Sequence, residues 1–253
     1  MTAGNERLSL LERLDLALAA RVVADASLLG APLSWQAPWR EADVAEDGLW
    51  VSRVLALRGL LIDPRDATSI LRGGKGRYSA AHQELHLVRG LGRILEGMRE
   101  RAAPPDGWTA MDDFRRLTEG VPRFANNVIR RDVPWDGVHG VTYPPADGIT
   151  DLLDHFRVAE NFGLGAGFAN GHPVRQAVQV FWRFARIAPF PDLNVVMAFV
   201  MLNGFLLGRG YPRITPLAED RALLVRAVLG RRPQRLVQFE TRLVAQFENS
   251  APR

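Results

Sequence analysis

The stretch from His172 to Pro216 reads HPVRQAVQVFWRFARIAPFPDLNVVMAFVMLNGFLLGRGYPRITP, and it carries most of the information about the fold. The pattern up to Ile187 is that of an amphipathic helix. The run from Leu193 to Gly208 is apolar on all sides apart from two asparagines, so we expect a helix in the middle of the core. That run has 16 residues, fewer than the ~20 that span a bilayer, and we expect no membrane segment.

Helical periodicity extends over most of the chain. Between Leu8 and Leu29 apolar residues recur every four positions, which builds one buried helix face. We predict helices at Leu8–Leu29, Glu41–Leu61, Pro64–Leu71, Ser79–Glu100, Thr109–Thr118, Ile149–Asn161, Pro173–Ile187, Asp192–Leu207, Leu217–Leu229 and Pro233–Phe247. Thr109 is expected to cap its helix, with Asp112 three residues later in the manner of a capping box. The fold class is therefore predicted to be all-α.

Residues 126–145, NNVIRRDVPWDGVHGVTYPP, interrupt the helical pattern. Short β-prone pieces, two turn signals that end in glycine and a proline pair predict a short β-hairpin flap here. A glycine-rich connection, GLGAGFANG, follows at 163–171. Because no linker or internal repeat divides the chain, we predict a helical extension over residues 1–64 packed on one compact domain over residues 65–253.

Composition excludes several classes of protein. The 253 residues are 47% hydrophobic and 24% charged, as in a globular chain with a full core. The absence of cysteine excludes disulfide scaffolds, thiolate nucleophiles and cysteine-based zinc sites. The basic residues, 31 arginines and one lysine, are scattered among 28 acids, so we expect no nucleic-acid partner. The N-terminus has no apolar signal segment, and we expect a cytoplasmic location.

Short motifs predict neither a metal nor a cofactor. His82 and His86 lie four residues apart, as in the zinc motif H-E-x-x-H, but Glu84 is in the wrong place between them. The glycine-rich stretch follows a predicted helix and not a strand, so it lacks the setting of a dinucleotide-binding turn. The sequence also contains no P-loop and no G-x-S-x-G motif.

The loop between the two C-terminal helices resembles that of the Fic (filamentation induced by cAMP) family of nucleotidyl transferases. The family signature is H-P-F-x-[DE]-G-N-G-R-x-x-R, and residues 188–199 read A-P-F-P-D-L-N-V-V-M-A-F. The matching residues are Pro189, Phe190, Asp192 and Asn194. Three further pieces occur in family-like order: E-L-H at 84–86, G-V-T-Y-P-P at 140–145 in the place of the target-docking flap, and H-P-V at 172–174. The resemblance covers about residues 65–250 and implies a Fic-like helical fold.

The same resemblance implies that the family's chemistry is degraded in this chain. The signature histidine is the general base of the family, and Ala188, in its position, cannot accept a proton. The glycines of the phosphate-binding turn correspond to Leu193 and Val195, so we expect the anion nest to be lost. The two arginines that neutralise the polyphosphate correspond to Val196 and Phe199.

Two polar signature residues remain. By resemblance Asp192 is the magnesium-binding acid and Asn194 the phosphate-contacting amide, although both residue types also suit the start of a helix as N-caps. The family's inhibitory motif [ST]-x-x-x-E-[GN] has a loose counterpart in residues 25–30, where Leu29 replaces the glutamate. An ion pair across the nucleotide pocket is thus expected to be replaced by apolar packing.

Two functions are compatible with these changes. The first is a pseudoenzyme that lacks nucleotidyl (AMP) transferase activity and binds a protein or small ligand; a second copy of the chain is an open alternative as partner. The second is a repurposed enzyme that acts on a non-nucleotide small molecule, with Asp192 as acid or base. An open cavity beside Asp192 favours the second, and a filled one the first. The predicted pocket residues are Ala188, Pro189, Phe190, Leu193, Asn194, Val195, Val196, Phe199, Arg183 and Arg186, and the predicted flap contacts are Trp135, His139 and Tyr143.

Overall fold

The computed structural model describes residues 43–101, 105–126, 128–137, 141–158, 168, 172–209, 211, 213–218, 220, 222, 224 and 238–245. Within these residues the regular structure is helical and no strand is present. The α-helices are α2 (Val44–Arg58), α3 (Pro64–Leu71), α4 (Gln83–Glu100), α5 (Gly107–Thr118), α6 (Ile149–Val158), α7 (Pro173–Ile187) and α8 (Asn194–Gly208). Two 3-10 helices, η1 (Pro122–Phe124) and η2 (Ala146–Gly148), and a helical stretch at 238–245 complete the described structure. The predicted all-α class is confirmed.

Side-chain caps fix where several helices begin. The carboxylate of Asp43 accepts a hydrogen bond from the backbone N–H of Ala45, and that of Asp63 accepts one from Arg65, each at 2.8 Å. α3 and α7 have the predicted bounds. The expected capping box at Thr109 was wrong, because Asp106 has the extended backbone of an N-cap and its carboxylate accepts the Thr109 N–H at 2.7 Å. The predicted helix at 8–29, with the counterpart of the inhibitory motif at 25–30, lies outside the described residues.

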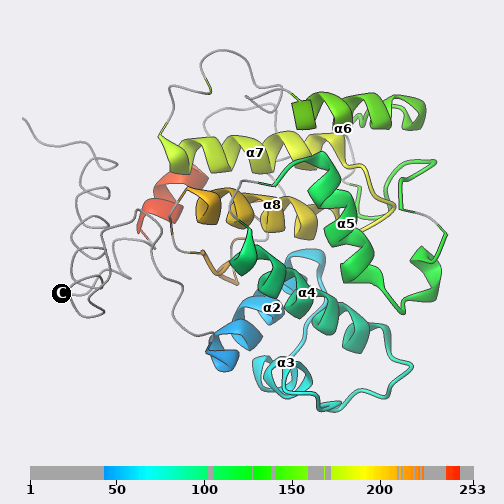
Figure 1. Cartoon of the computed structure of the whole chain (residues 1–253), viewed down its shortest axis with the longest axis vertical. Coiled ribbons are helices and arrows are strands. Elements are labelled where there is room, and N and C mark those ends of the chain that lie inside the picture. Colours follow the sequence, from blue (N-terminus) through cyan, green and yellow to red (C-terminus); the bar gives the residue numbers. More distant parts are fainter. Residues whose placement is uncertain are drawn as a thin grey trace, which may run out of the picture.

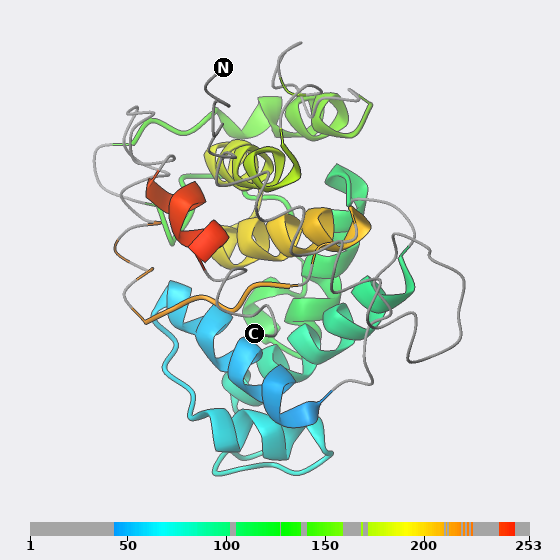
Figure 2. The same ribbon diagram turned by 90° about the vertical axis from the view of Figure 1, so that its left-hand side faces the viewer.

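α8 is the central helix of the fold. It packs against α7 on one side and against α2, α4 and α5 on the other (Figures 1 and 2). Twelve of its 15 residues are buried, as the apolar sequence predicts for a helix surrounded by protein. None of the helices in the described part of the chain is long and apolar enough to cross a membrane.

Buried polar side chains fasten the C-terminal segment to this core. Asn203 on α8 accepts a hydrogen bond from the backbone N–H of Ile214 at 2.7 Å, and the indole of Trp50 donates to the carbonyl of Ile214 at 2.9 Å. The carboxylate of Asp47 on α2 binds both Arg99 on α4 and Arg213. These contacts place residues 213–217 alongside α2 and α8.

The predicted β-hairpin flap is not seen in the described residues of 126–145, which form turns and irregular chain. Two backbone donors of this segment bond to another loop, and the one backbone bond within it that the described residues show, from Gly137 to Pro134 at 2.8 Å, closes a turn. The N–H of Arg130 donates to the carbonyl of Pro189 at 2.9 Å, and that of Trp135 donates to Pro191 at 2.7 Å. We call residues 130–136 the strap, because they run across the loop between α7 and α8.

Candidate functional site

The loop between α7 and α8 has a left-handed residue at each end. Ala188, with φ of 44°, ends α7 and donates its N–H to the carbonyl of Phe184 at 3.0 Å. Leu193, with φ of 64°, is the N-cap of α8. This conformation costs a non-glycine residue about 1–2 kcal/mol, so surrounding contacts must hold it. Leu193 thus keeps the backbone turn of the position at which the resemblance places a glycine.

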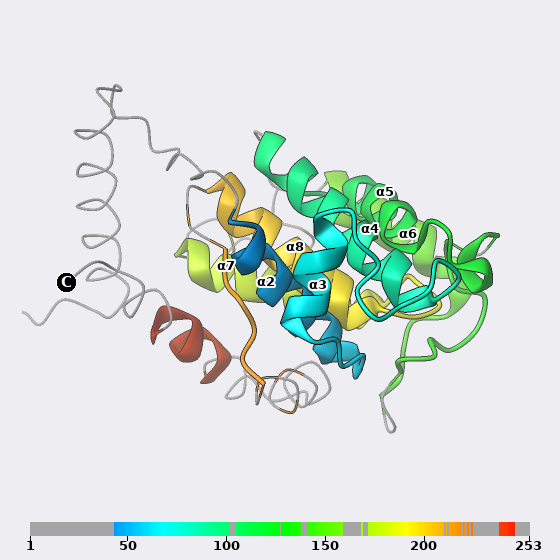
Figure 3. The same ribbon diagram turned by 90° about the horizontal axis from the view of Figure 1, so that it is seen from below.

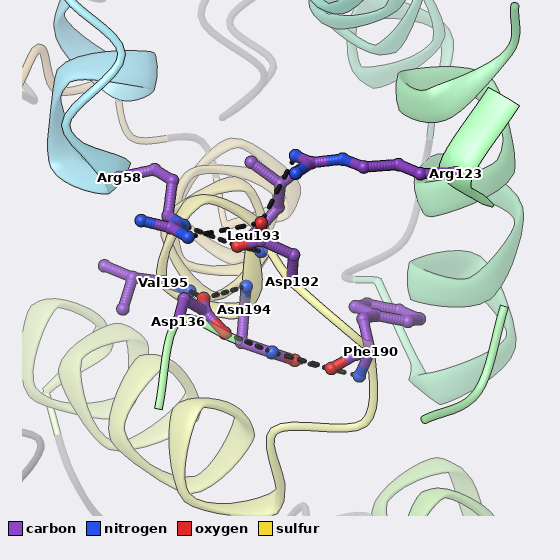
Figure 4. Close-up of polar contacts among 8 residues, drawn as sticks. All are labelled: Arg58, Arg123, Asp136, Phe190, Asp192, Leu193, Asn194 and Val195. Atoms are coloured by element: carbon purple, nitrogen blue, oxygen red, sulfur yellow. Dashed lines mark hydrogen bonds and ion pairs between the residues drawn. The ribbon is translucent and has the colours of Figure 1, made fainter. Parts of the chain in front are cut away.

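Asn194 closes the loop from the inside. Its side-chain oxygen accepts the N–H of Phe190 at 2.9 Å, and its side-chain nitrogen donates to the carbonyl of Phe190 at 2.9 Å. The same nitrogen donates to the carboxylate of Asp136 at 2.8 Å (Figure 4). The amide that the resemblance assigned to phosphate contact is therefore hydrogen-bonded to Phe190 and Asp136.

The carboxylate of Asp136 occupies the N-terminus of α8. One oxygen accepts the backbone N–H of Asn194 at 2.6 Å and that of Val195 at 3.4 Å (Figure 4). The first N–H groups of a helix lack partners within the helix and favour a negative charge. The expected loss of the anion nest at Leu193 and Val195 stays a prediction, but the N–H groups of Asn194 and Val195 do point to an acceptor here. The strap supplies that acceptor, the carboxylate of Asp136.

Asp192 lies between two arginines and is 1% exposed. One of its oxygens accepts hydrogen bonds from Nε of Arg58 at 2.5 Å and from the backbone N–H of Leu193 at 2.7 Å. The other lies 3.3 Å from a terminal nitrogen of Arg58 and 3.2 Å from one of Arg123 (Figure 4). Asp192 is not the N-cap of α8, since Leu193 holds that position. Its carboxylate joins the end of α2 and the η1 turn to the loop.

Electrostatics bind the two acids and their partners into one cluster. Burial raises the pKa of Asp136, the hydrogen bond from Asn194 lowers it, and the nearby charge of Asp192 raises it further. The hydrogen bond to Asp192 raises the pKa of the Arg58 guanidinium. The arginines Arg58 and Arg123 balance the two carboxylates, so the cluster carries no net charge when all four groups are ionised.

Arg130 fastens the strap from its buried side. Its side chain donates to the carbonyl oxygens of Ala188 at 2.7 Å, Asp132 at 2.9 Å and Pro144 at 2.7 Å. The residue is 4% exposed, and burial lowers the pKa of its guanidinium. Because all three partners are carbonyls, this charge is stabilised by dipoles and not by an ion pair.

The predicted pocket residues lie together around this loop, but as parts of the core. Phe190 stacks on Phe114 with ring centroids 3.9 Å apart. Arg186 lies over the ring of Trp182, and within the described residues neither Arg183 nor Arg186 bonds to Asp192 or Asn194. Fully buried members of the predicted set are Ala188, Pro189, Phe190, Leu193, Asn194, Val196 and Phe199, while Val195, Arg183 and Arg186 are half-buried. Seven of the ten predicted residues are therefore buried among side chains of the core.

The flap residues that the structure describes are exposed or half-buried. Trp135 is 55% exposed, and the guanidinium of Arg123 lies 5.7 Å from the centre of its ring. Val133 on the same strap is also exposed, whereas Tyr143 is half-buried. His139 lies outside the described residues.

Three other histidines, His82, His86 and His172, contact groups of their own chain. His82 precedes α4 and contacts the carboxylate of Glu84, while His86 is hydrogen-bonded to the carbonyl of Ala80 at 2.9 Å. His172 caps α7 by accepting the N–H of Val174 at 3.2 Å. No group of three or more metal-ligating side chains occurs among the residues that the structure describes.

Four residues of the site were missed at the sequence level. Arg58, Arg123 and Arg130 are three among many scattered arginines, so nothing in the sequence singles them out. Asp136 precedes Gly137, and this pair indicates a turn rather than a contact with a distant helix. Since these residues are 58 or more positions from their partners in several of the contacts, only the fold brings them together.

No family model matches the sequence, and no curated protein shows detectable similarity to it. Solved structures are informative. A Fic domain-containing signaling protein from Bacteroides thetaiotaomicron has a TM-score of 0.68 and 16% identity, covering 96% of this chain and 95% of that one. A fragment of Fic-1 from C. elegans has a TM-score of 0.60 and 17% identity, covering 95% and 74%. A Fic family protein from Desulfovibrio desulfuricans has a TM-score of 0.51 and 16% identity, covering 99% and 70%.

These similarities agree with the resemblance of residues 188–199 to the Fic signature. At identities of 16–17% they concern the fold and not the activity. The chain has the fold of Fic-domain proteins.

Proposed function

We propose that this Fic-fold chain is a pseudoenzyme: it lacks nucleotidyl (AMP) transferase activity and acts by binding a protein or a small ligand. The observation that carries the proposal is the carboxylate of Asp136 on the first N–H groups of α8. A phosphate that approached the same N–H groups would meet a negative charge already bound there.

The loop also lacks the groups that would transfer a proton. Ala188 stands in the position of the family base, and its carbonyl accepts a hydrogen bond from Arg130. Asp192 is the nearest acid within the loop, but both of its oxygens bind guanidinium groups. This carboxylate is therefore already held by side chains of its own chain.

The alternative of a repurposed enzyme is less well supported. It requires a cavity that admits a small molecule to an acid or base, whereas Asp192 is 1% exposed and Phe190 and Leu193 are fully buried beside it. Binding at the surface is compatible with the site, since Trp135 and Val133 on the strap are 55% and 71% exposed. These two side chains are the contacts that we expect a partner to use.

The proposal is tested by giving the full chain ATP labelled on its α-phosphate, with magnesium, and by titrating ATP into the chain in a calorimeter. We expect no labelled protein and no heat of binding that differs between the unaltered chain and a variant of the loop between α7 and α8. The variants Asp192→Asn and Asp132→Asn form a matched pair, because Asp192 is buried in the cluster and Asp132 is exposed. Magnesium-dependent labelling that Asp192→Asn abolishes and Asp132→Asn preserves would contradict the proposal.

A further inference from the structure

A second region of the molecule, between α2 and α3, contains a surface pocket of about 570 Å³. This volume lies within the range of small-molecule sites. The lining residues are Ala45, Arg65, Thr68, Ser69, Arg72 and Gly74. α2 and α3 lie side by side, and α3 is on the far side of the bundle from α7 (Figures 2 and 3). The pocket is therefore separate from the loop between α7 and α8.

One wall of the pocket is a polar face of α3. Residues 65, 68, 69 and 72 follow the spacing i, i+3, i+4 and i+7, which places them on one side of a helix. The opposite side, with Ala67 and Ile70, is buried in the core. Thr68 packs so closely on α2 that a Cβ on Gly48 would lie 2.1 Å from its hydroxyl. The close packing fixes α3 against α2, and the stripe of two arginines and two hydroxyl residues borders the hollow.

The two arginines of the stripe are available for a ligand. Within the described residues no hydrogen bond or ion pair engages the guanidinium of Arg65 or of Arg72, and both side chains are exposed. The carboxylates nearby are already used: Asp63 accepts the backbone N–H of Arg65, and Asp66 pairs with Arg77 at 3.0 Å. None of the lining residues is acidic.

We infer that this pocket is a binding site for a small organic molecule that carries phosphate groups at both ends. Guanidinium groups bind phosphate oxygens through paired hydrogen bonds. The Cα atoms of Arg65 and Arg72 are separated by seven residues, or about 10 Å along a helix. A bisphosphate can reach both arginines at once, whereas a single phosphate engages both only if the two side chains bend toward each other. The hydroxyl of Ser69, between the arginines, adds a donor for the body of the ligand.

The test is calorimetric titration of the full chain with a sugar bisphosphate as the probe, compared with the corresponding monophosphate and with inorganic phosphate. We expect one bisphosphate per chain, bound at least about tenfold more tightly than the monophosphate. Arg65→Gln and Arg72→Gln should each weaken binding by about tenfold, and the double variant should show no binding. Because the probe contacts α3 and not α8, this result does not depend on whether the chain binds ATP.

Arg53→Gln is the matched control, because Arg53 lies on α2 outside the lining of the pocket. It should leave the affinity unchanged, and thermal unfolding of every variant shows whether the fold is intact. The inference is overturned if the bisphosphate does not bind at millimolar concentration, or if it binds the folded double variant as tightly as the unaltered chain. Equal affinity for the bisphosphate and for inorganic phosphate would also overturn it.

Discussion

The loop between α7 and α8 and the pocket between α2 and α3 use arginine in opposite ways. At the loop, Arg58 and Arg123 bind Asp192, and Arg130 binds three backbone carbonyls. At the pocket, Arg65 and Arg72 bind nothing in the described part of the chain. The difference comes from the buried groups at the loop, Asp192 and Arg130, because a buried charge needs partners from its own chain, whereas Arg65 and Arg72 are exposed.

This comparison separates two roles. Charges that are satisfied internally hold the loop in a strained conformation, with Ala188 and Leu193 left-handed. Charges that face solvent without a partner contribute little to stability and remain free for a ligand. Substitutions at the loop should therefore reduce the free energy of unfolding, and substitutions at the pocket should reduce binding alone.

The largest loss is expected for Arg130→Met. Methionine keeps the apolar stem but removes the donors to the carbonyls of Ala188, Asp132 and Pro144. The bonds to Ala188 and Pro144 connect the strap to two other segments of the chain, and both would be lost. We expect the free energy of unfolding in urea to fall by about 3 kcal/mol. The control is Arg131→Met. Because the Arg131 side chain is exposed, this substitution should change the free energy of unfolding by less than about 0.5 kcal/mol. Equal losses for the two variants would mean that Arg130 does not fasten the strap.

Asp192→Ala should have the second largest effect. It leaves the guanidinium groups of Arg58 and Arg123 without their carboxylate and removes the acceptor of the Leu193 N–H. Because both arginines are about one-third exposed, they can turn to water, and we expect a loss of about 2 kcal/mol in urea unfolding. Asp132→Ala, at an exposed acid on the strap, should lose almost nothing. A stabilised Asp192→Ala variant would show that the cluster exists for something other than the fold.

A smaller effect is expected at Asp136, on how the free energy of unfolding depends on pH. Burial raises the pKa of this carboxyl above its ordinary 3.8, so the folded chain holds the proton more tightly than the unfolded chain. The stability that this contributes is fully present below pH 3.8 and is lost as the pH rises through the raised pKa. The unaltered chain should therefore gain stability relative to Asp136→Asn as the pH falls from 7 toward 4.

Urea unfolding at several pH values measures this difference, with Asp132→Asn, at an exposed acid on the same strap, as the control variant. A difference between the unaltered chain and Asp136→Asn that is constant over this range, or that changes in the opposite sense, would mean that the carboxylate on α8 is not penalised by burial.

The contrast also explains how far the sequence could predict the molecule. Local patterns were enough for helices such as Pro64–Leu71 and Pro173–Ile187, because apolar spacing and a leading proline act within one segment. The strap was predicted as a hairpin, since its turn signals do not reveal that its N–H groups bond to Pro189 and Pro191. Likewise, the signature positions predicted a site in the loop between α7 and α8 but not which distant residues contact that loop. The acid that fills the N-terminus of α8, Asp136, comes from a segment 58 residues away.

The smallest effect on stability is expected at the pocket, for the double variant Arg65→Gln and Arg72→Gln. Neither guanidinium has a partner to lose in the described structure, so the free energy of unfolding should change by less than about 0.5 kcal/mol. The same pair of changes at Arg58 and Arg123 should cost more, because there the glutamines would leave the buried charge of Asp192 without an ion pair. Similar losses for both double variants would erase the distinction between arginines that hold the fold and arginines that are free to bind.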